Sequence, residues 1–287
     1  MNADGVFSIG ATHAVCQDYV IAGNGAGSCG SRDAGPYVIL SDGCSSSPDT
    51  DIGARLLVRA MDQIWIGAPN EKLEELHREA ARTALGWAEL IGVPAEAVDA
   101  TLLSAHVRGD ELIVACSGDG VIVLESRAGV LDVYAISSPS GYPFYPAYVH
   151  QPERLAEMID NRRSIKELKH FRRDSAQAEF ALVAVTTSES LTEVFTRNVV
   201  DYKYVGVASD GLNSFFRTQP SPHGKRLEPV CLVDVLSQFW SFKNSHGAFV
   251  ERRVKKFKKD AEARSWDHAD DLSLGVIHLG DAHVRQN

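Results

Sequence analysis

The stretch Pro36-Tyr37-Val38-Ile39-Leu40-Ser41-Asp42-Gly43 is a β-branched and aromatic run that ends on an aspartate and a glycine. Such residues favour strands and Asp-Gly favours a turn, so the stretch predicts a strand that ends at Asp42. The same texture recurs in three later segments, each with an aspartate beside a small or acidic residue at one end of an apolar run: Leu112 to Gly120 with Asp119, Tyr204 to Gly211 with Asp210, and Asp270-Asp271-Leu272-Ser273 before Leu274 to Leu279.

Short carboxylates at strand ends meet where the strands converge, and we expect these aspartates to share one rim of a sheet protein. Their mutual repulsion must be neutralised, and a pair of divalent cations with oxygen ligands is suited to do so. Any one of Asp42, Asp119 or Asp210, taken alone, is typical of an ordinary turn. Their repetition after strand-like runs favours a metal-dependent enzyme.

The overall charge excludes some classes of partner. The chain has 287 residues, with 29 Lys and Arg against 38 Asp and Glu, and a net charge of −9. This acidity argues against nonspecific binding to nucleic acid or to an anionic membrane surface. No stretch approaches the roughly 20 apolar residues of a membrane span, and residues 1–10 lack the pattern of a signal peptide. We expect a cytoplasmic protein.

The cysteines show no metal-binding or disulfide pattern. There are five of them, with no CxxC or Cys/His spacing. An odd number without such spacing favours reduced thiols and argues against a structural zinc site.

Hydrophobic periodicity predicts a mixture of strands and helices. Alternation over residues 6–9 and 18–22 predicts a hairpin-like start, followed by a glycine- and serine-rich loop over residues 23–35. Helical spacing follows in four places, and the first two helices are expected to pair: from near Asp51, over 71–91, near 230–242 and over 247–263. Residues 101–136 read as antiparallel strands with tight turns, and residues 180–185 and 204–208 as two more strands.

Residues 137–152 hold four prolines and four aromatic residues, and they are predicted to form an irregular loop. The basic stretch Arg162 to Arg173 follows. These aromatics and arginines either hold a phosphopeptide or cover an edge of the core. The basic run Lys255 to Lys259 is interpreted as the solvated face and carboxyl end of a helix.

No segment has the composition of a linker, and no internal repeat is present. Strands open the chain and a strand, Leu274 to Leu279, closes it, so the first and last segments are expected to share a sheet. We expect one domain over residues 1–287.

In order, the chain carries Cys-Gln-Asp at 16–18, Ser-Asp-Gly at 41–43, Gly-Asp-Gly at 118–120, Ser-Asp-Gly at 209–211 and Asp-Asp-Leu-Ser at 270–273. This order resembles the metal-dependent protein phosphatases of the protein phosphatase 2C family, over about residues 12–279. The resemblance implies an α+β fold, a four-layer αββα sandwich in which two antiparallel sheets are flanked by helix pairs. It also implies a centre of two Mg²⁺ or Mn²⁺ ions.

Position by position, the resemblance implies that Asp42 bridges both metal ions and that the Gly43 carbonyl binds one of them. Asp210 and Asp270 would complete the shell of the first ion. Asp18 matches an acidic position at the outer edge of the second ion. Asp119, in Gly-Asp-Gly where the family usually has Gly-Asp-Ser, matches a position that can recruit a third ion.

Two positions depart from the family pattern. His13 stands where the family usually has an arginine that grips the substrate phosphate. It is either a phosphate ligand, charged only below its pKa, or a structural histidine. Cys44 stands where many relatives have a histidine proposed to protonate the leaving group. It is either an acidic thiol or a small packing residue, and protonation then falls to water or to His13.

The sequence is therefore interpreted as a serine/threonine phosphoprotein phosphatase that uses a metal-bridging hydroxide, with Asp42 and His13 as catalytic candidates. Two alternatives stay open. One is a catalytically weak regulatory or phosphoprotein-binding module, and the other is a small-molecule phosphomonoesterase. The seven candidate residues are His13, Asp18, Asp42, Gly43, Asp119, Asp210 and Asp270.

Overall fold

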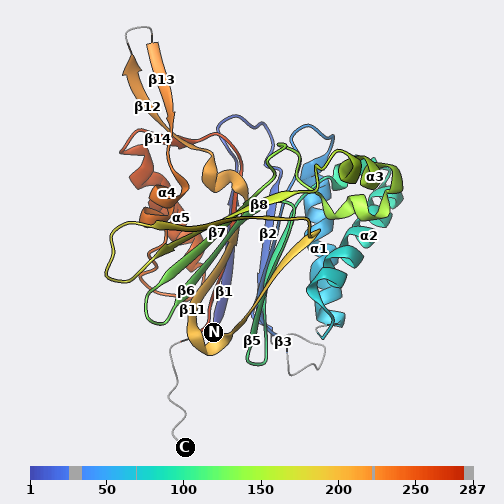
Figure 1. Cartoon of the computed structure of the whole chain (residues 1–287), viewed down its shortest axis with the longest axis horizontal. Helices are drawn as coiled ribbons and strands as arrows, with labels where there is room; N and C mark the ends of the chain where they lie inside the picture. Colours follow the sequence, from blue (N-terminus) through green and yellow to red (C-terminus); the bar gives the residue numbers. More distant parts are fainter. Residues whose placement is uncertain (26–33, 69, 222–223, 281–287) are drawn as a thin grey trace, which may run out of the picture.

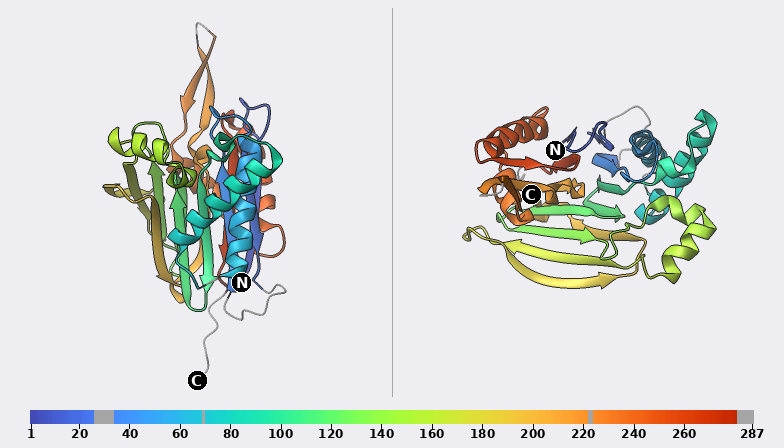
Figure 2. Two further views of the ribbon diagram at one scale, coloured as in Figure 1. Left: turned by 90° about the vertical axis from the view of Figure 1, so that its right-hand side faces the viewer. Right: turned by 90° about the horizontal axis from the view of Figure 1, so that it is seen from above.

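Two β-sheets lie face to face between two layers of helices in the computed structural model, which describes residues 1–25, 34–68, 70–221 and 224–280. Figure 2, in its view from above, shows these four layers in the order helices, sheet, sheet, helices. The expected αββα sandwich is thus confirmed.

The larger sheet has seven strands, and the two ends of the described chain meet in it. Its order is β1 (Asn2–Ser8), β15 (Leu272–His278), β11 (Tyr202–Ala208), β6 (Gly120–Ser126), β7 (Leu131–Ser137), β8 (Lys166–Arg173) and β9 (Ala181–Ser188). Strands β1 and β15 are antiparallel, with Asn2 opposite His278. The expectation that the first and last segments share a sheet is confirmed.

The smaller sheet has five antiparallel strands. Its order is β10 (Thr192–Asn198), β5 (Glu111–Ser117), β4 (Leu102–Arg108), β3 (Ala34–Asp42) and β2 (Asp18–Gly23). The predicted hairpin-like start is wrong, because β1 and β2 belong to different sheets and β2 pairs with β3 instead. The loop predicted over 23–35 falls largely outside the described residues.

A third, three-stranded sheet was not expected. It contains β13 (Gly224–Pro229), β12 (Phe215–Ser221) and β14 (Trp266–His268), and β12 and β13 form a hairpin that projects from one end of the sandwich (Figure 1). Short β14 attaches this hairpin to the segment that precedes β15.

Helices α1 (Thr50–Gly67) and α2 (Leu73–Ile91) pair with each other over the five-stranded sheet, as expected. Leu57, Met61 and Trp65 of α1 follow helical spacing and are fully buried there. Helices α4 (Leu232–Phe239) and α5 (Phe249–Glu262) cover the seven-stranded sheet. A third apolar layer fills the space between the sheets and includes Val38 and Leu40 of β3.

The predicted irregular loop over 137–152 is partly wrong, because it ends in a 3₁₀ turn, η2 (Pro146–His150), which leads directly into helix α3 (Pro152–Asp160). Proline is compatible with both elements because it occupies the first turn of each, where its missing N–H is not needed. The remaining 3₁₀ turns are η1 (Ala95–Val98), η3 (Val199–Asp201) and η4 (Asp210–Asn213).

The aromatic residues of this segment mostly cover the core. Phe144, Tyr145 and Tyr148 are buried in a cluster with Met158, whereas Tyr142 is exposed. Burial of these three rings agrees with the interpretation that they cover an edge of the core. The four described cysteines are free thiols, in line with the expected reduced state; Cys29 lies outside the described residues.

Two helical glycines test how tightly α1 packs. A Cβ atom on Gly53 would lie 1.6 Å from the carbonyl oxygen of buried Ala97, whereas one on Gly86 of α2 meets no heavy atom within 4 Å. We expect Gly53→Ala to lower the free energy of unfolding by about 1–3 kcal/mol through overpacking. Gly86→Ala should raise it by about 0.5–1 kcal/mol, because alanine restricts the unfolded chain. Urea unfolding measures both, and shifts of the same sign would contradict this packing.

Candidate functional site

Asp18 and Asp42 lie directly opposite each other on neighbouring strands. Asp18 is the first residue of β2, Asp42 is the last of β3, and the register pairs the two. Directly opposed side chains on antiparallel strands are close neighbours, and two like charges there repel each other. Each of these two carboxyl groups influences the pKa of the other.

Asp210 and Asp119 lie near Asp42 as well. Asp210 comes from the end of the seven-stranded sheet, and Asp119 comes from the turn that joins the two sheets. Asp210 opens η4 just after β11, and its charge raises the pKa of Asp42. Asp119 lies between β5 and β6, where its charge raises the pKa of Asp42 and the charge of Asp210 raises its own pKa. Side chains that are up to about two hundred residues apart in the chain therefore form one acidic cluster.

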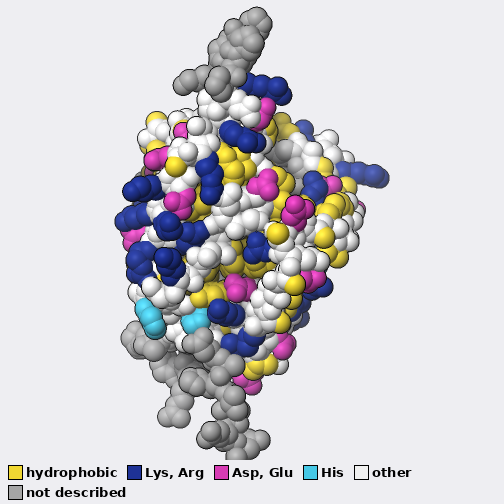
Figure 3. All heavy atoms as spheres, turned by 90° about the vertical axis from the view of Figure 1, so that its left-hand side faces the viewer, with side chains coloured by type: hydrophobic (Ala, Val, Ile, Leu, Met, Phe, Trp, Pro, Cys, Tyr) yellow, Lys and Arg dark blue, Asp and Glu magenta, His cyan; other side chains and the backbone are white. Residues whose placement is uncertain are grey.

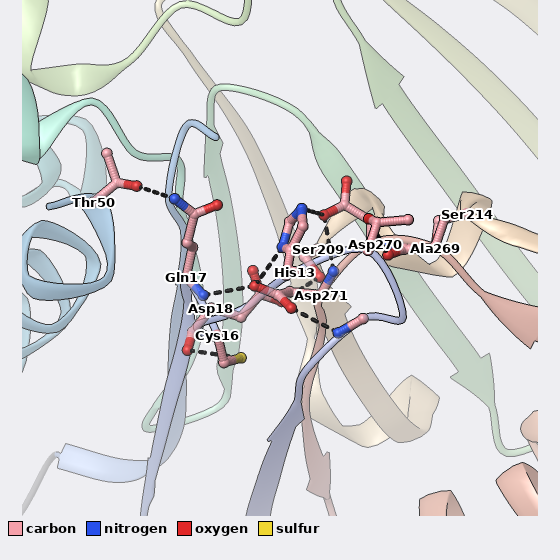
Figure 4. Close-up of polar contacts among 12 residues, drawn as sticks. His13, Cys16, Gln17, Asp18, Thr50, Ser209, Ser214, Ala269, Asp270 and Asp271 are labelled. Carbon is pink, nitrogen blue, oxygen red and sulfur yellow. Dashed lines mark hydrogen bonds and ion pairs between the residues drawn. The ribbon is translucent and has the colours of Figure 1, made fainter. Parts of the chain in front are cut away.

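Asp270 and Asp271 lie just before β15 and face His13 (Figure 4). Nε2 of His13 is 3.4 Å from Oδ1 of Asp270, and its Nδ1 is 2.9 Å from Oδ2 of Asp271. Asp271 raises the pKa of His13 above its ordinary value through this contact, assisted by the charges of Asp270 and Asp18. The imidazole is thus held by two carboxylates.

Asp271 is the residue that the sequence analysis missed. Its side chain is 1% exposed, and it accepts backbone hydrogen bonds from Gly10 at 2.7 Å and from Gln17 at 2.6 Å (Figure 4). It therefore fixes the chain on both sides of His13. The Asp-Asp pair at 270–271 was visible in the sequence, but nothing in it showed which carboxylate turns inward.

Close backbone packing explains the glycine that follows Asp210. A Cβ atom on Gly211 would lie 1.8 Å from the backbone oxygen of Asp271. A Cβ atom on Gly43 would similarly lie 2.8 Å from Cβ and O of Thr50, at the start of α1. Glycine lets the segments that carry Asp42, Asp210 and Asp271 approach each other.

The acidic cluster contains little positive charge. Burial raises the pKa of Asp18 and of Asp119 to about 7 each. Burial, followed by the charges of Asp18 and Asp210, raises the pKa of Asp42 well above its ordinary value. The pKa values stay high because no sufficient counter-charge surrounds these carboxyl groups.

Lys166, at the start of β8, is one cation that acts on the cluster from the side. Its side chain is buried, and its Nζ donates a 2.9 Å hydrogen bond to the backbone oxygen of Leu191. Its charge lowers the pKa of Asp119, although burial of that carboxyl group has the larger, opposite effect. Sequence analysis placed Lys166 in a basic stretch but gave no sign that it turns inward.

The donor set suits a hard divalent cation. Asp18, Asp42, Asp119, Asp210 and Asp270 offer only carboxylate oxygens, which Mg²⁺ and Mn²⁺ prefer. Oδ1 of Asp18 is buried without a hydrogen-bond partner among the described residues, so it has an unused acceptor. Within the same residues no three His, Cys, Asp or Glu side chains form a ready-made ligand set. Instead, Asp42 interacts electrostatically with both Asp18 and Asp210, and a metal ion bound among these groups would favour the ionised form of all three.

Cys44 turns from this cluster toward the segment after β7. It packs against the buried cluster around Phe144 and Tyr145, and its Sγ lies 3.1 Å from Oγ of Ser46. These contacts agree with the interpretation of Cys44 as a packing residue.

Comparisons with known proteins agree with this geometry. The family model for protein phosphatase 2C matches residues 10–248. A bacterial serine phosphatase matches with a TM-score of 0.57 and 11% identity, over 99% of this chain and 100% of that chain. The S. agalactiae serine/threonine phosphatase matches with a TM-score of 0.55 and 14% identity, over 97% and 99% of the two chains.

The catalytic domain of the serine threonine protein phosphatase PstP, in complex with two manganese ions, matches with a TM-score of 0.51 and 14% identity, over 96% of each chain. At these identities the solved structures support the fold. A search of curated proteins found no match. The family model spans well over half of the sequence and includes Asp18, Asp42, Asp119 and Asp210, and the chain therefore belongs to the protein phosphatase 2C family.

Proposed function

We propose that this protein is a Mg²⁺/Mn²⁺-dependent serine/threonine phosphoprotein phosphatase. One observation carries the proposal: Asp18, Asp42, Asp119 and Asp210 come from separate strand ends and form one acidic cluster with raised pKa values. Such a cluster costs stability unless cations neutralise it. Membership of the protein phosphatase 2C family supports the same activity.

We assign the metal ligands by their places in the cluster. Asp42 is central, because it contacts both Asp18 and Asp210, and it is our candidate for the bridging carboxylate. Asp210, Asp270 and the Gly43 carbonyl would hold the first ion. Asp18 and Asp119 would serve the second ion and an additional one. When bound, two such ions supply hydroxide near neutral pH and stabilise the charge of the phosphoryl group in flight.

The surrounding residues keep these ligands in place. Asp271 ties Gly10 and Gln17 to the segment before β15, and Ser209 donates a 2.7 Å hydrogen bond to Oδ2 of Asp18. In hydrolysis, a hydroxide oxygen would form a bond to phosphorus as the bond between phosphorus and the serine or threonine oxygen breaks, and the alkoxide that leaves would take a proton from water or from His13. The hydrogen bonds of Asp271 and Ser209 orient the carboxylates before the substrate binds.

Contact between His13 and the substrate phosphate stays a prediction. Both ring nitrogens face carboxylates, so a phosphate would have to replace Asp270 as the partner of Nε2. Such an exchange is reasonable because the Asp270 side chain is 38% exposed, whereas Asp271 is buried. Asp271 would then keep the ring in position.

Three further proposals concern the protein as a whole. We propose a phosphoprotein as its substrate and the cytoplasm as its location. None of the described helices is both long and apolar enough to cross a membrane. We also propose a single domain over residues 1–287, and the pairing of β1 with β15 supports it.

Phosphopeptides test the activity directly. With Mn²⁺, we expect release of phosphate from phosphoserine and phosphothreonine peptides, and loss of release when a chelator is added. Phosphotyrosine peptides should react more slowly. Turnover of simple esters without turnover of any phosphopeptide would instead indicate a small-molecule phosphomonoesterase, and no turnover at any Mn²⁺ concentration would indicate a regulatory module.

Replacement of the central carboxylate tests the site. Asp42→Ala removes the proposed bridge, and we expect a loss of at least about 100-fold in the turnover of p-nitrophenyl phosphate with Mn²⁺. Circular dichroism should show an unchanged fold. Glu89→Ala, on the exposed face of α2, is the matched control and should keep full activity. Near-normal turnover by Asp42→Ala would refute the assignment.

Thermal unfolding tests metal binding without relying on turnover. Saturating Mn²⁺ should raise the melting temperature of the unaltered protein by about 5 °C, since it binds only the folded state. Asp42→Ala should lose most of this shift. In the presence of chelator, Asp42→Ala should melt no lower than the unaltered protein, because loss of the Asp42 carboxylate relieves repulsion in the cluster. Equal Mn²⁺ shifts for both proteins would place the metal elsewhere.

A further inference from the structure

A cavity lies between α4 and α5. Its volume is about 330 Å³, and it is lined by Ser241, Phe242, Lys243, Asn244, Phe249, Arg252, Arg253 and Lys256. It is at the opposite end of the sandwich from the acidic cluster. Asn2, which begins β1, donates a 2.7 Å hydrogen bond to Ser245 beside this cavity, whereas β1 ends at Ser8, near the Gly10 that contacts Asp271.

Four cations line the cavity, and three of them have no carboxylate partner among the described residues. Arg252 donates to Oδ1 of Asn244 at 2.8 Å and to the backbone oxygen of His246 at 2.6 Å. Arg253 donates to the backbone oxygens of Phe239 and Gln238, at the end of α4. These contacts hold both guanidinium groups in place without cancelling their charge.

The other two cations, Lys243 and Lys256, are held less firmly by neighbouring residues. Lys243 is exposed and makes no hydrogen bond or ion pair with another described residue. Lys256 lies 3.2 Å from Asp260 in an exposed pair, and such pairs contribute little and exchange easily. No Asp or Glu is among the residues that line the cavity.

This local charge contrasts with the rest of the chain, which has a net charge of −9. Figure 3 shows lysine and arginine side chains gathered over the face that α5 forms. The sequence analysis interpreted the basic run of α5 as a solvated helix face, and that reading does not account for a cavity at its beginning. Like charges around a concave space favour an anion within it.

The apolar part of the lining is aromatic. Phe242 and Phe249 pack edge to face with ring centroids 5.3 Å apart, and Phe242 also lies 5.3 Å from Trp240. Phe249 is 2% exposed, whereas Phe242 is partly exposed. Ser241 and Asn244 add a hydroxyl and an amide to the lining. A ligand with a flat aromatic ring and polar edges is complementary to such a surface.

We propose that this cavity binds a small phosphorylated compound that carries an aromatic ring, the chemistry of a nucleoside monophosphate. Its volume lies at the lower end of the range for small-molecule sites, about 300–1,000 Å³. The arginines and Lys243 bind the phosphate, and Phe242 contacts the ring. A protein partner would need a broad surface of about 800 Å², so the concave shape favours a small ligand.

Binding of AMP and GMP, measured by calorimetry near physiological salt, tests the proposal. The acidic cluster of a phosphatase can also take phosphomonoesters, so the titration is made with Mn²⁺ and again with a chelator, and repeated in Asp42→Ala. We expect saturable binding of at least one nucleotide in all three, at sub-millimolar concentration. Inorganic phosphate and adenosine should each bind at least about tenfold more weakly.

Two substitutions locate the site. Lys243→Gln removes a cation that has no described partner, so the fold is expected to be unaffected, and it should weaken nucleotide binding by about tenfold. Arg252→Gln should weaken nucleotide binding to a similar extent. Lys255→Gln is the matched control, since Lys255 lies on α5 but outside the lining and pairs with Glu251. All three variants should keep the turnover of p-nitrophenyl phosphate.

The outcomes separate the alternatives. No saturable binding of either nucleotide up to about 5 mM overturns the proposal. Equal affinity for AMP and inorganic phosphate overturns the role of the ring. Tighter binding of an acidic peptide than of the nucleotides assigns the cavity to a protein partner instead. Equal weakening by Lys255→Gln shows nonspecific attraction to α5. None of these results depends on the proposed phosphatase activity.

Discussion

Repulsion among buried carboxylates is the constraint on which this structure depends. Asp18 and Asp42 face each other across β2 and β3, and Asp210 reaches Asp42 from the opposite sheet. In water these groups would separate, but the sandwich holds their strands within fixed distances. Burial, together with the neighbouring negative charges, raises the pKa values of Asp18, Asp42 and Asp119, and this is the electrostatic cost of the arrangement. A cation in the cluster converts the cost into binding free energy, which explains how a metal-dependent centre and a stable fold coexist.

Backbone packing concentrates the acids, and hydrogen bonds direct them. Gly211 lets the chain around Asp210 touch the backbone of Asp271, and Asp271 in turn holds Gly10 and Gln17. Burial of the apolar layers outside and between the sheets stabilises the fold and offsets the unfavourable free energy of the acidic cluster. At the opposite end, the cavity at α5 carries the reverse charge. The molecule thus places an acidic cluster and a basic cavity at the two ends of one sandwich.

Much of the fold could be predicted because apolar periodicity is local. Helices α1 and α2, the strand that ends at Asp42 and the final strand were found within a few residues of their bounds. The errors have a common cause. The hairpin expected at the start was wrong because β2 pairs with β3, while β1 pairs with β15, more than two hundred positions away. Elements β14 and α3 are too short for their periodicity to stand out. Within the site, Asp42 and Asp210 were recognised by their Asp-Gly context, whereas Asp271 and Lys166 were not, because burial of a charged side chain leaves no local pattern.

By itself, the sequence determined which residues could act: oxygen ligands after apolar runs, in the order of the protein phosphatase 2C family, without a competing Cys or His pattern. That information is chemical and local, since residue type and neighbours define it. Only the tertiary structure decided which side chains meet. It brought Asp42 to Asp18 and Asp210, turned His13 toward Asp270 and Asp271, and moved Cys44 into an aromatic cluster. It also gathered Arg252 and Lys243 around a cavity. Distance in space depends on the register and stacking of whole sheets, and no short stretch of chain carries that information.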